Sequence, residues 1–417
     1  MEIGMIGLGD MGLPMARKLS QLGYHVNGCD VPDKLAEIRR KLSDTNVQVY
    51  DNGMEVVKRS DFQIYSVPAE MIGSVVAELG PSTKPGAIVT GQTSVKTPEV
   101  LAFEKHLPKN SHIVPIHPMY GPTIDPQGKN FVLIHHQQCS PQAYETAQEI
   151  FREFKANLIS LPNYQEHDRI TADVQATTQT GFLSMATAWK KRGFFPWESA
   201  SYLGGIDNVK ILLALRILNN KAHLYSGIAI LNPFAQEQIN RYADSASELF
   251  ALSISGQESE LRKRLEAAGN FVFDNASNGK ILDDKILGEF NLGRKEGRKP
   301  NSHLSQFALI DSWHKLSIKP HKNDLYSTPL SKLRLGIAEY LWKNKELREE
   351  SISALISDLT IREDDLAFII ATHEWASIVN RGDIQGYQQQ FDETKEFFKN
   401  QIGEGMKRSN ELIKKLA

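Results

Sequence analysis

The sequence contains few cysteines, no excess of basic residues and no long apolar run. Its only two cysteines, Cys29 and Cys139, exclude a framework of disulfides and fit a reducing compartment. Lys and Arg number 48 against 50 Asp and Glu, so no positive excess points to a nucleic-acid partner. No apolar stretch approaches the ~18 residues of a membrane span. We therefore expect a cytoplasmic enzyme without nucleic-acid or membrane partners, and no cleavable leader, because a strand-like segment begins at Glu2.

The N-terminal part of the chain alternates short apolar runs with amphipathic segments. The candidate strands are Ile3–Ile6, Tyr24–Cys29, Phe62–Val67, Ala87–Thr90, His112–Ile116, Asn130–Ile134 and Asn157–Leu161. The amphipathic segments between the early strands are Pro14–Leu22, Asp33–Leu42 and Met71–Leu79. Strands that alternate with helices predict a parallel sheet covered on both faces. Residues 1–162 are thus expected to form an α/β domain of the Rossmann type.

After Asn163 the strand signals nearly vanish and a helical periodicity takes over. Long segments with this periodicity are His167–Lys191, Asn208–Ser226, Pro233–Ser255, Glu258–Val272, Leu304–Leu316, Leu330–Lys343, Asp364–Val379 and Gln385–Phe398. The polar stretch Phe273–Pro300 is interpreted as a loop or linker. The pattern predicts an all-α part in two regions: a substrate or dimerisation-type domain over 163–299 and a second, repeat-like region over 300–417.

The two helical regions resemble each other in sequence. Ala251–Phe271 can be laid over Ser377–Phe397 at a fixed offset, and Leu213–Tyr225 lies loosely over Leu333–Arg348. An internal duplication explains this likeness. Unrelated amphipathic hairpins also resemble one another, so both explanations stay open.

A glycine-rich hexapeptide follows the first strand and opens a helix. It has the pattern G-x-G-x-x-G and consists of Gly7, Leu8, Gly9, Asp10, Met11 and Gly12. In this context Gly7 permits the tight turn, Gly9 lets the backbone approach a pyrophosphate, and Gly12 allows the helix to pack closely on the strand. The N-terminus of the helix adds N–H donors and a positive dipole. The hexapeptide predicts a dinucleotide-binding site.

Asp30 ends the second strand, where an acidic side chain hydrogen-bonds the adenine ribose of NAD. A carboxylate at that place repels the 2′-phosphate of NADP. Lys34, Arg39 and Arg40 follow closely, however, and can neutralise such a phosphate. The residues alone slightly favour NAD over NADP.

Polar residues follow three further strands of the predicted sheet. Ser66 and Val67 end one strand and are expected to line the nicotinamide side, although ordinary loop chemistry explains them equally well. Ser94 follows the next strand, and His117 follows the strand His112–Ile116. Ligands of an open parallel sheet bind outside the carboxyl ends of its strands. An imidazole there can handle a hydroxyl proton during hydride transfer, and a serine hydroxyl in reach would fix its tautomer.

The other histidines do not indicate a metal site. The tandem His135–His136 lacks the spacing of metal ligands, and the sequence contains neither an H-E-x-x-H nor a C-x-x-C motif. We therefore expect chemistry without a bound metal.

Three segments together resemble one enzyme family. They are the hexad His117–Pro122, the preceding Thr93–Lys96, and Glu166–Asp168 with Gln175 and Ala176. Over nearly its whole length the sequence resembles prephenate dehydrogenases, most closely the fungal NADP-dependent branch. The resemblance implies oxidative decarboxylation of prephenate to 4-hydroxyphenylpyruvate in tyrosine biosynthesis, with reduction of a nicotinamide cofactor. It also favours NADP over NAD, against the slight indication from Asp30.

The resemblance implies roles for single residues. It places His117 at the ring 4-hydroxyl, Ser94 between this histidine and the cofactor, and Arg216 at a substrate carboxylate. Tyr120 of the hexad is a further candidate for substrate binding. Many members carry a second histidine where this chain has Gln179, and an amide can hydrogen-bond substrate but cannot titrate. Because prephenate is a dianion, a charged Arg216 within an apolar helix is also a reasonable partner on physical grounds.

Three other functions stay open. An arogenate dehydrogenase would differ only in the amino group of its substrate, which the sequence does not settle. A 3-hydroxyacid dehydrogenase needs a catalytic lysine in a G-x-x-x-K pattern just after the Rossmann domain, and the match Gly403–Lys407 lies near the C-terminus instead. A non-catalytic dinucleotide-binding regulator gives no reason for the pair Ser94 and His117.

The helical part also bears on assembly and substrate binding. In related enzymes the helical domain pairs with a second copy from another subunit. A duplicated chain would be a monomer with an internal pseudo-dimer, and the alternative is a homodimer. The second region has Glu339 or Tyr340 where the first has Arg216, so it lacks the arginine at that position. Lys210, on the same helix as Arg216, is a weaker candidate for the substrate carboxylate.

Overall fold

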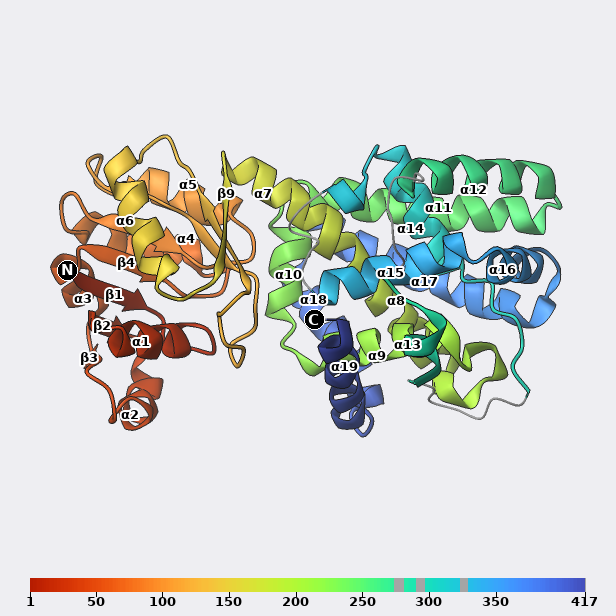
Figure 1. Ribbon diagram of the computed structural model, residues 1–417, viewed down its shortest axis with the longest axis horizontal. Helices are drawn as coiled ribbons and strands as arrows, with labels where there is room; N and C mark the ends of the chain where they lie inside the picture. The colour runs from red at the N-terminus through yellow and green to blue at the C-terminus, as the bar shows by residue number, and fades with distance from the viewer. Residues whose placement is uncertain (274–280, 290–296, 323–328, 417) are drawn as a thin grey trace. The chain divides into compact units, whose positions relative to one another are not determined.

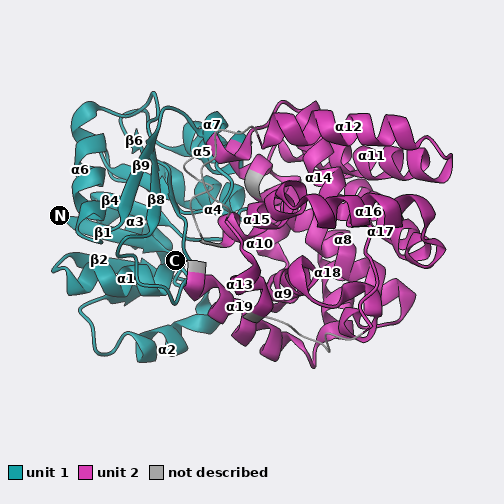
Figure 2. Cartoon of the chain, turned by 45° about the vertical axis from the view of Figure 1, so that its right-hand side comes forward, with its two compact units in different colours: residues 1–169 teal, residues 170–417 magenta. Residues whose placement is uncertain are grey.

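The computed structural model describes residues 1–273, 281–289, 297–322 and 329–416. The chain divides into two compact units, unit 1 with residues 1–169 and unit 2 with residues 170–417 (Figure 2). The division falls within helix α7 (Tyr164–Thr171), shortly after the boundary expected at residue 162.

Unit 1 is built on a six-stranded parallel sheet in the order β3-β2-β1-β4-β5-β6 (Figure 1). Its strands are β1 (Glu2–Ile6), β2 (His25–Cys29), β3 (Gln48–Tyr50), β4 (Phe62–Tyr65), β5 (Ile88–Gly91) and β6 (His112–Ile113). In the register, Ile3 pairs with Val26 of β2 on one side and with Phe62 of β4 on the other. This strand order is that of dinucleotide-binding Rossmann folds. The prediction of a parallel α/β domain is confirmed.

Helices cover both faces of this sheet. They are α1 (Gly12–Gln21), α2 (Pro32–Lys41), α3 (Gly53–Arg59), α4 (Ile72–Leu79), α5 (Thr97–His106) and α6 (Pro141–Arg152). Side chains alternate across β1, so Ile3 and Met5 enter one core with Leu19 of α1, whereas Ile6 enters the other with Val76 of α4. The members of both cores are almost fully buried, and this apolar burial holds the helices to the sheet.

A second, three-stranded sheet contains β7 (Ile116–Pro118), β8 (Asn130–Ile134) and β9 (Asn157–Leu161). β7 runs antiparallel to β8, with His117 opposite Val132. The prediction of one strand over His112–Ile116 is therefore wrong, because the chain leaves the main sheet after β6 and enters the second sheet at β7. Pro115 stands at this break, and proline has no N–H to donate to a ladder. His117 thus lies inside an antiparallel strand, not beyond the end of a parallel one.

Unit 2 consists of helices in the part that the structure describes. Its α-helices are α8 (Thr177–Arg192), α9 (Gly205–Asn219), α10 (His223–Ile230), α11 (Ala235–Ile254), α12 (Glu258–Val272), α13 (Asp284–Glu289), α14 (Leu304–Lys315), α15 (Pro329–Lys343), α16 (Lys345–Ser357), α17 (Leu359–Asn380), α18 (Ile384–Phe398) and α19 (Ile402–Leu416). The prediction of an all-α part is confirmed. Among the described helices of the chain, none is long and apolar enough to cross a membrane.

Two predicted segments of unit 2 differ from the structure. The single helix expected over Asn208–Ser226 is two helices, α9 and α10, because Asn220 adopts an extended conformation with ψ −175°. Within the loop expected over Phe273–Pro300, helix α13 forms and buries Leu287. Residues 274–280 and 290–296 of that loop lie outside the described residues.

The long helices of unit 2 pack reciprocally. Helix α8 contacts α17, and α14 contacts α11. Helices α8 and α11 lie within residues 163–299, whereas α14 and α17 lie within residues 300–417. Each region therefore packs its long helices on those of the other.

Candidate active site

The glycine loop between β1 and α1 has the shape of a phosphate cradle. Gly7 has a φ of +93°, in the region that favours glycine. A Cβ at Gly12 would lie 2.0 Å from the carbonyl oxygen of Gly7, so a side chain does not fit there. A Cβ at Gly9 would meet no atom within 4 Å, so this face of the loop is open. These residues fit a pyrophosphate that approaches at Gly9 and the N-terminus of α1.

Asp30 holds the glycine loop from the end of β2. Its Oδ2 accepts a hydrogen bond from the N–H of Leu8 at 2.6 Å, and its Oδ1 accepts one from the N–H of Val31 at 2.8 Å. Leu8 is buried, whereas Asp10 is exposed and Met11 is half-buried. Because both oxygens of Asp30 bind backbone donors, its carboxylate is fixed against the loop.

The basic residues that follow β2 differ in their partners. Arg39 is paired with Asp51 at 2.8 Å. Lys34 and Arg40 are exposed on α2, and neither forms an ion pair with any residue that the structure describes. These two side chains are therefore available to an anionic ligand.

Ser66 and Val67 follow β4 directly and lie against the glycine loop. The N–H of Ser66 donates to the carbonyl oxygen of Ile6 at 2.7 Å. A Cβ at Gly7 would lie 2.5 Å from the carbonyl oxygen of Ser66 and 3.1 Å from Cγ1 of Val67. The structure thus brings both residues beside the nucleotide loop.

A buried chain of hydrogen bonds begins at His117. Its Nδ1 lies 2.8 Å from Nε2 of His167 on α7, and Nδ1 of His167 lies 2.8 Å from Oδ1 of Asp168. His117 is 6% exposed, and the other two side chains are fully buried. Asp168 also accepts hydrogen bonds from the N–H groups of Lys96 and Thr97, at 2.7 Å each. We call His117, His167 and Asp168 the histidine relay.

The surroundings of the relay determine where its protons lie. Burial alone would raise the pKa of Asp168, but hydrogen bonds from His167 and Thr97 outweigh it and hold this pKa below its usual value. Burial lowers the pKa of both imidazoles, and His167 and Lys96 lower that of His117 further, well below 6.5. Ionised Asp168 requires the proton of His167 on Nδ1, so Nε2 of His167 accepts the Nδ1–H of His117. Nε2 of His117 is left with a lone pair that can accept a proton.

A buried ion pair supports strand β7. Nζ of Lys96 lies 2.9 Å from Oε1 of Glu99 and donates to the carbonyl oxygens of Ile116 at 2.7 Å and Gly91 at 3.0 Å. Both charged side chains are fully buried. The hydroxyl of Thr93 donates to Oε2 of Glu99 at 2.6 Å. Because its donors are all occupied, the pair is a complete structural unit that ties β5 and α5 to β7.

Three other polar residues follow strands of unit 1. Ser94 is half-buried between β5 and α5, and within the described structure no hydrogen bond joins it to His117. Tyr120 places its ring 6.3 Å from that of Phe131, and its buried hydroxyl has no hydrogen-bond partner among the described residues. Gln92, at the end of β5, is buried, and in the same part of the chain both its amide atoms lack partners. Unpartnered buried polar atoms are uncommon, and a ligand can supply the missing partner.

Arg216 lies on α9 in unit 2. Its Nη1 donates to Oδ1 of Asn410 at 2.6 Å, and no carboxylate of the described residues pairs with it. Burial lowers its pKa. Tyr225 lies on α10 and accepts a hydrogen bond from Asn220 at 2.6 Å. Gln179 lies on α8 and is buried.

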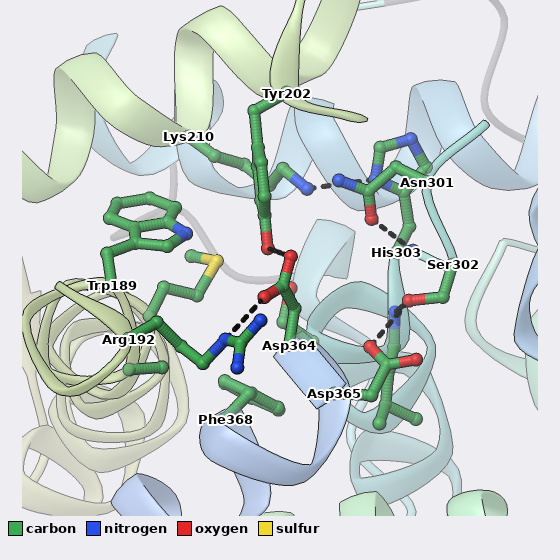
Figure 3. Close-up of a pocket in the computed structure, with 14 residues that line it drawn as sticks. Trp189, Arg192, Tyr202, Lys210, Asn301, Ser302, His303, Asp364, Asp365 and Phe368 are labelled. Atoms are coloured by element: carbon green, nitrogen blue, oxygen red, sulfur yellow. Dashed lines mark hydrogen bonds and ion pairs between the residues drawn. The ribbon is translucent and has the colours of Figure 1, made fainter. Parts of the chain in front are cut away.

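Lys210, the weaker candidate on α9, is already neutralised. It is 2% exposed, and its Nζ lies 2.6 Å from Oδ1 of Asp207 and 2.8 Å from Nδ1 of His303. Lys210 and His303 line a pocket inside unit 2, in which Ser302 also donates to Asp365 at 2.6 Å (Figure 3). Because its charge is paired within the protein, Lys210 has no need of a substrate carboxylate.

His167 and Asp168 were not predicted as partners of His117. They stand far from it in the sequence, and the one signal was their place in the segment Glu166–Asp168 of the family resemblance. In the described residues, no group of three or more His, Cys, Asp or Glu side chains is arranged to hold a metal ion.

A glycine loop on a parallel sheet, followed by a helical unit, defines the class of two-domain nicotinamide-dependent dehydrogenases. Two family models match the chain within this class. The nucleotide-binding domain of prephenate dehydrogenase matches residues 15–160. A model of the 6-phosphogluconate dehydrogenase C-terminal domain matches residues 176–417.

Full-length relatives lead to the family. The chain is 42% identical to prephenate dehydrogenase (NADP+) of Saccharomyces cerevisiae, over 99% of this chain and 93% of the relative. It is 41% identical to probable prephenate dehydrogenase (NADP+) of Schizosaccharomyces pombe, over 100% of this chain and 97% of the relative. A solved structure of Aquifex aeolicus prephenate dehydrogenase with hydroxyphenyl propionate and NAD+ is 19% identical, covers 64% of this chain and 94% of that chain, and has a TM-score of 0.49. The chain belongs to the prephenate dehydrogenase family, and the resemblance found in the sequence is confirmed.

Proposed function

We propose that the protein catalyses the oxidative decarboxylation of prephenate to 4-hydroxyphenylpyruvate with NADP, a step of tyrosine biosynthesis. The observation that carries this proposal is the histidine relay, which leaves a neutral imidazole with an available lone pair at His117. The names of the two fungal relatives, which cover nearly the whole chain, support the substrate and the cofactor.

The relay suits a reaction that develops positive charge beside a hydroxyl. A hydride leaves the ring carbon that bears the 4-hydroxyl, and the ring carboxylate leaves as CO2. When bound, NADP supplies the hydride acceptor. Nε2 of His117 takes or strongly holds the hydroxyl proton while charge develops, and this proton returns to the oxygen as the ring becomes an aromatic phenol. Electrons and protons balance, because no net proton is released.

Four further residues contact substrate or cofactor in this proposal. Arg216 binds a substrate carboxylate, Tyr120 and Gln179 hydrogen-bond the substrate, and Ser94 lies between His117 and the cofactor. Arg216 lacks an acidic partner and the hydroxyl of Tyr120 lacks any partner within the described residues, which supports an anionic, hydrogen-bonding ligand.

The glycine loop and its neighbours hold the dinucleotide. Gly7–Gly12 takes the pyrophosphate, and Ser66 and Val67 line the nicotinamide side. An acidic Asp30 is compatible with NADP, because its two oxygens are engaged by backbone N–H groups of the loop and its end. Lys34 and Arg40 are the candidate partners of the 2′-phosphate. NAD is the alternative cofactor.

Assembly and location belong to the same proposal. Residues 163–299 and 300–417 are two copies of one helical unit behind a nucleotide domain of residues 1–162, and they form a pseudo-dimer within a monomer. The reciprocal packing of α8 on α17 and of α14 on α11 supports this arrangement, with a homodimer as the alternative. Cys29 and Cys139 are both free, which supports a cytoplasmic location.

The test is a spectroscopic assay of the purified protein. Prephenate is added with NADP or with NAD, and reduced nicotinamide is followed by its absorbance. We expect turnover with NADP and slower turnover with NAD. Arogenate in a parallel assay distinguishes the substrates. Absence of reduction with prephenate and either cofactor would overturn the proposed function.

A further inference from the structure

Arg334, on α15, is a buried arginine without an acidic partner. It is 4% exposed and stands between the buried residues Leu333 and Leu335. Within the described residues its Nε has no hydrogen-bond partner, and no carboxylate pairs with it. Arg264 of the same unit, in contrast, lies 2.7 Å from a carboxylate oxygen of Asp311. Burial lowers the pKa of Arg334 to about 10, so its guanidinium is still charged at neutral pH.

A second unmatched arginine lies on a neighbouring helix. Helix α15 contacts α9, which carries Arg216, and both helices contact α19. The short hydrogen bond of Arg216 goes to the neutral amide of Asn410. Arg216 and Arg334 act electrostatically on each other and on Tyr225. Two buried like charges repel and have lost hydration, so the arrangement is unfavourable until an anion enters.

We infer that Arg334 is a second substrate-binding residue, which holds one carboxylate of prephenate while Arg216 holds the other. This role rests on the proposed function. Prephenate carries two carboxylates, and a guanidinium binds a carboxylate through two parallel hydrogen bonds. The region 300–417 lacks an arginine at the position aligned with Arg216, and Arg334 supplies one from the facing helix instead.

Steady-state kinetics give the first readout. We expect Arg334→Met to raise the KM for prephenate roughly 10- to 100-fold and to leave the KM for NADP unchanged, since a charged hydrogen-bonded contact is lost. Arg334→Lys keeps the charge without the planar fork, so its KM lies between the two. Arg408→Met is the matched control, because Arg408 is exposed on α19 and paired with Glu404 at 2.7 Å.

Thermal unfolding gives a second readout that a purely structural residue would not produce. Without ligand, we expect Arg334→Met to unfold at a higher temperature than the wild type, since an unmatched buried charge is removed. Prephenate added without NADP should stabilise the wild type and Arg408→Met, but Arg334→Met far less, because a ligand stabilises only what it binds.

The outcomes separate this role from the proposed function. An unchanged KM for prephenate in both Arg334 variants, or a full prephenate-induced stabilisation of Arg334→Met, would show that Arg334 does not bind substrate. Arg334→Lys retains the charge and serves if Arg334→Met fails to fold. Failure of the wild type to turn over prephenate would instead overturn the proposed function itself.

Discussion

Unit 1 and unit 2 treat buried charge in different ways. In unit 1, Lys96 and Glu99 neutralise each other, and Asp168 receives hydrogen bonds from a histidine and from backbone N–H groups. In unit 2, neither Arg216 nor Arg334 has an acidic partner in the described part of the chain. A satisfied buried charge belongs to the scaffold and is complete without ligand. An unmatched one is incomplete until a ligand supplies the opposite charge.

The sharpest way to break this comparison is to remove one charge of the satisfied pair. We expect Lys96→Met to lower the free energy of unfolding by about 3–5 kcal/mol, because Glu99 is left buried and unpaired. The double variant with Glu99→Leu should recover most of the loss. Denaturant titration measures both effects. A loss below about 1 kcal/mol in the single variant would mean that the pair is not the buried unit described.

The histidine relay predicts a large effect on catalysis. We expect His117→Asn to lower kcat by roughly 10²–10⁴, because the amide cannot accept the hydroxyl proton. The KM for NADP should stay near that of the wild type. His25→Asn, an exposed histidine at the start of β2, is the control. Activity within a few fold of the wild type would exclude His117 as the proton acceptor.

Arg216 tests the other side of the comparison. We expect Arg216→Ala to raise the KM for prephenate by roughly tenfold or more, with a smaller change in kcat, because the carboxylate contact exists before and during the reaction. Steady-state kinetics with saturating NADP measure this. An unchanged KM would remove Arg216 from the substrate site.

The smallest predicted effect is the pH dependence of stability. Burial lowers the pKa of His117 and His167, so below about pH 6.5 the unfolded chain binds protons that the folded chain does not. The free energy of unfolding should therefore be complete above this pH and fall as the pH decreases, by up to about 1.4 kcal/mol per pH unit for each histidine. Denaturant titrations across this range measure the slope, which His117→Asn should reduce. Equal slopes in the two proteins would show that His117 is not held neutral by the fold.

Local patterns in the sequence predicted the parallel sheet, the glycine loop and the helical part, because periodicity and glycine spacing are short-range signals. The split of His112–Ile116 into two strands depends on Pro115 and on which sheet receives β7, and the second factor is tertiary. The relay joins His117 to His167 across the chain, and no local pattern encodes that distance. Arg334 was not predicted, because a single arginine in an amphipathic helix normally faces solvent, and only the packed structure shows its burial.

The protonation of the relay can be measured directly by nitrogen NMR of the histidine side chains in the wild type, with His117→Asn to assign the signal. At neutral pH we expect His117 to be uncharged, with its proton on Nδ1 and a lone pair on Nε2. An imidazolium, or a neutral ring with its proton on Nε2, would contradict the proposed role of His117 as the acceptor of the substrate hydroxyl proton.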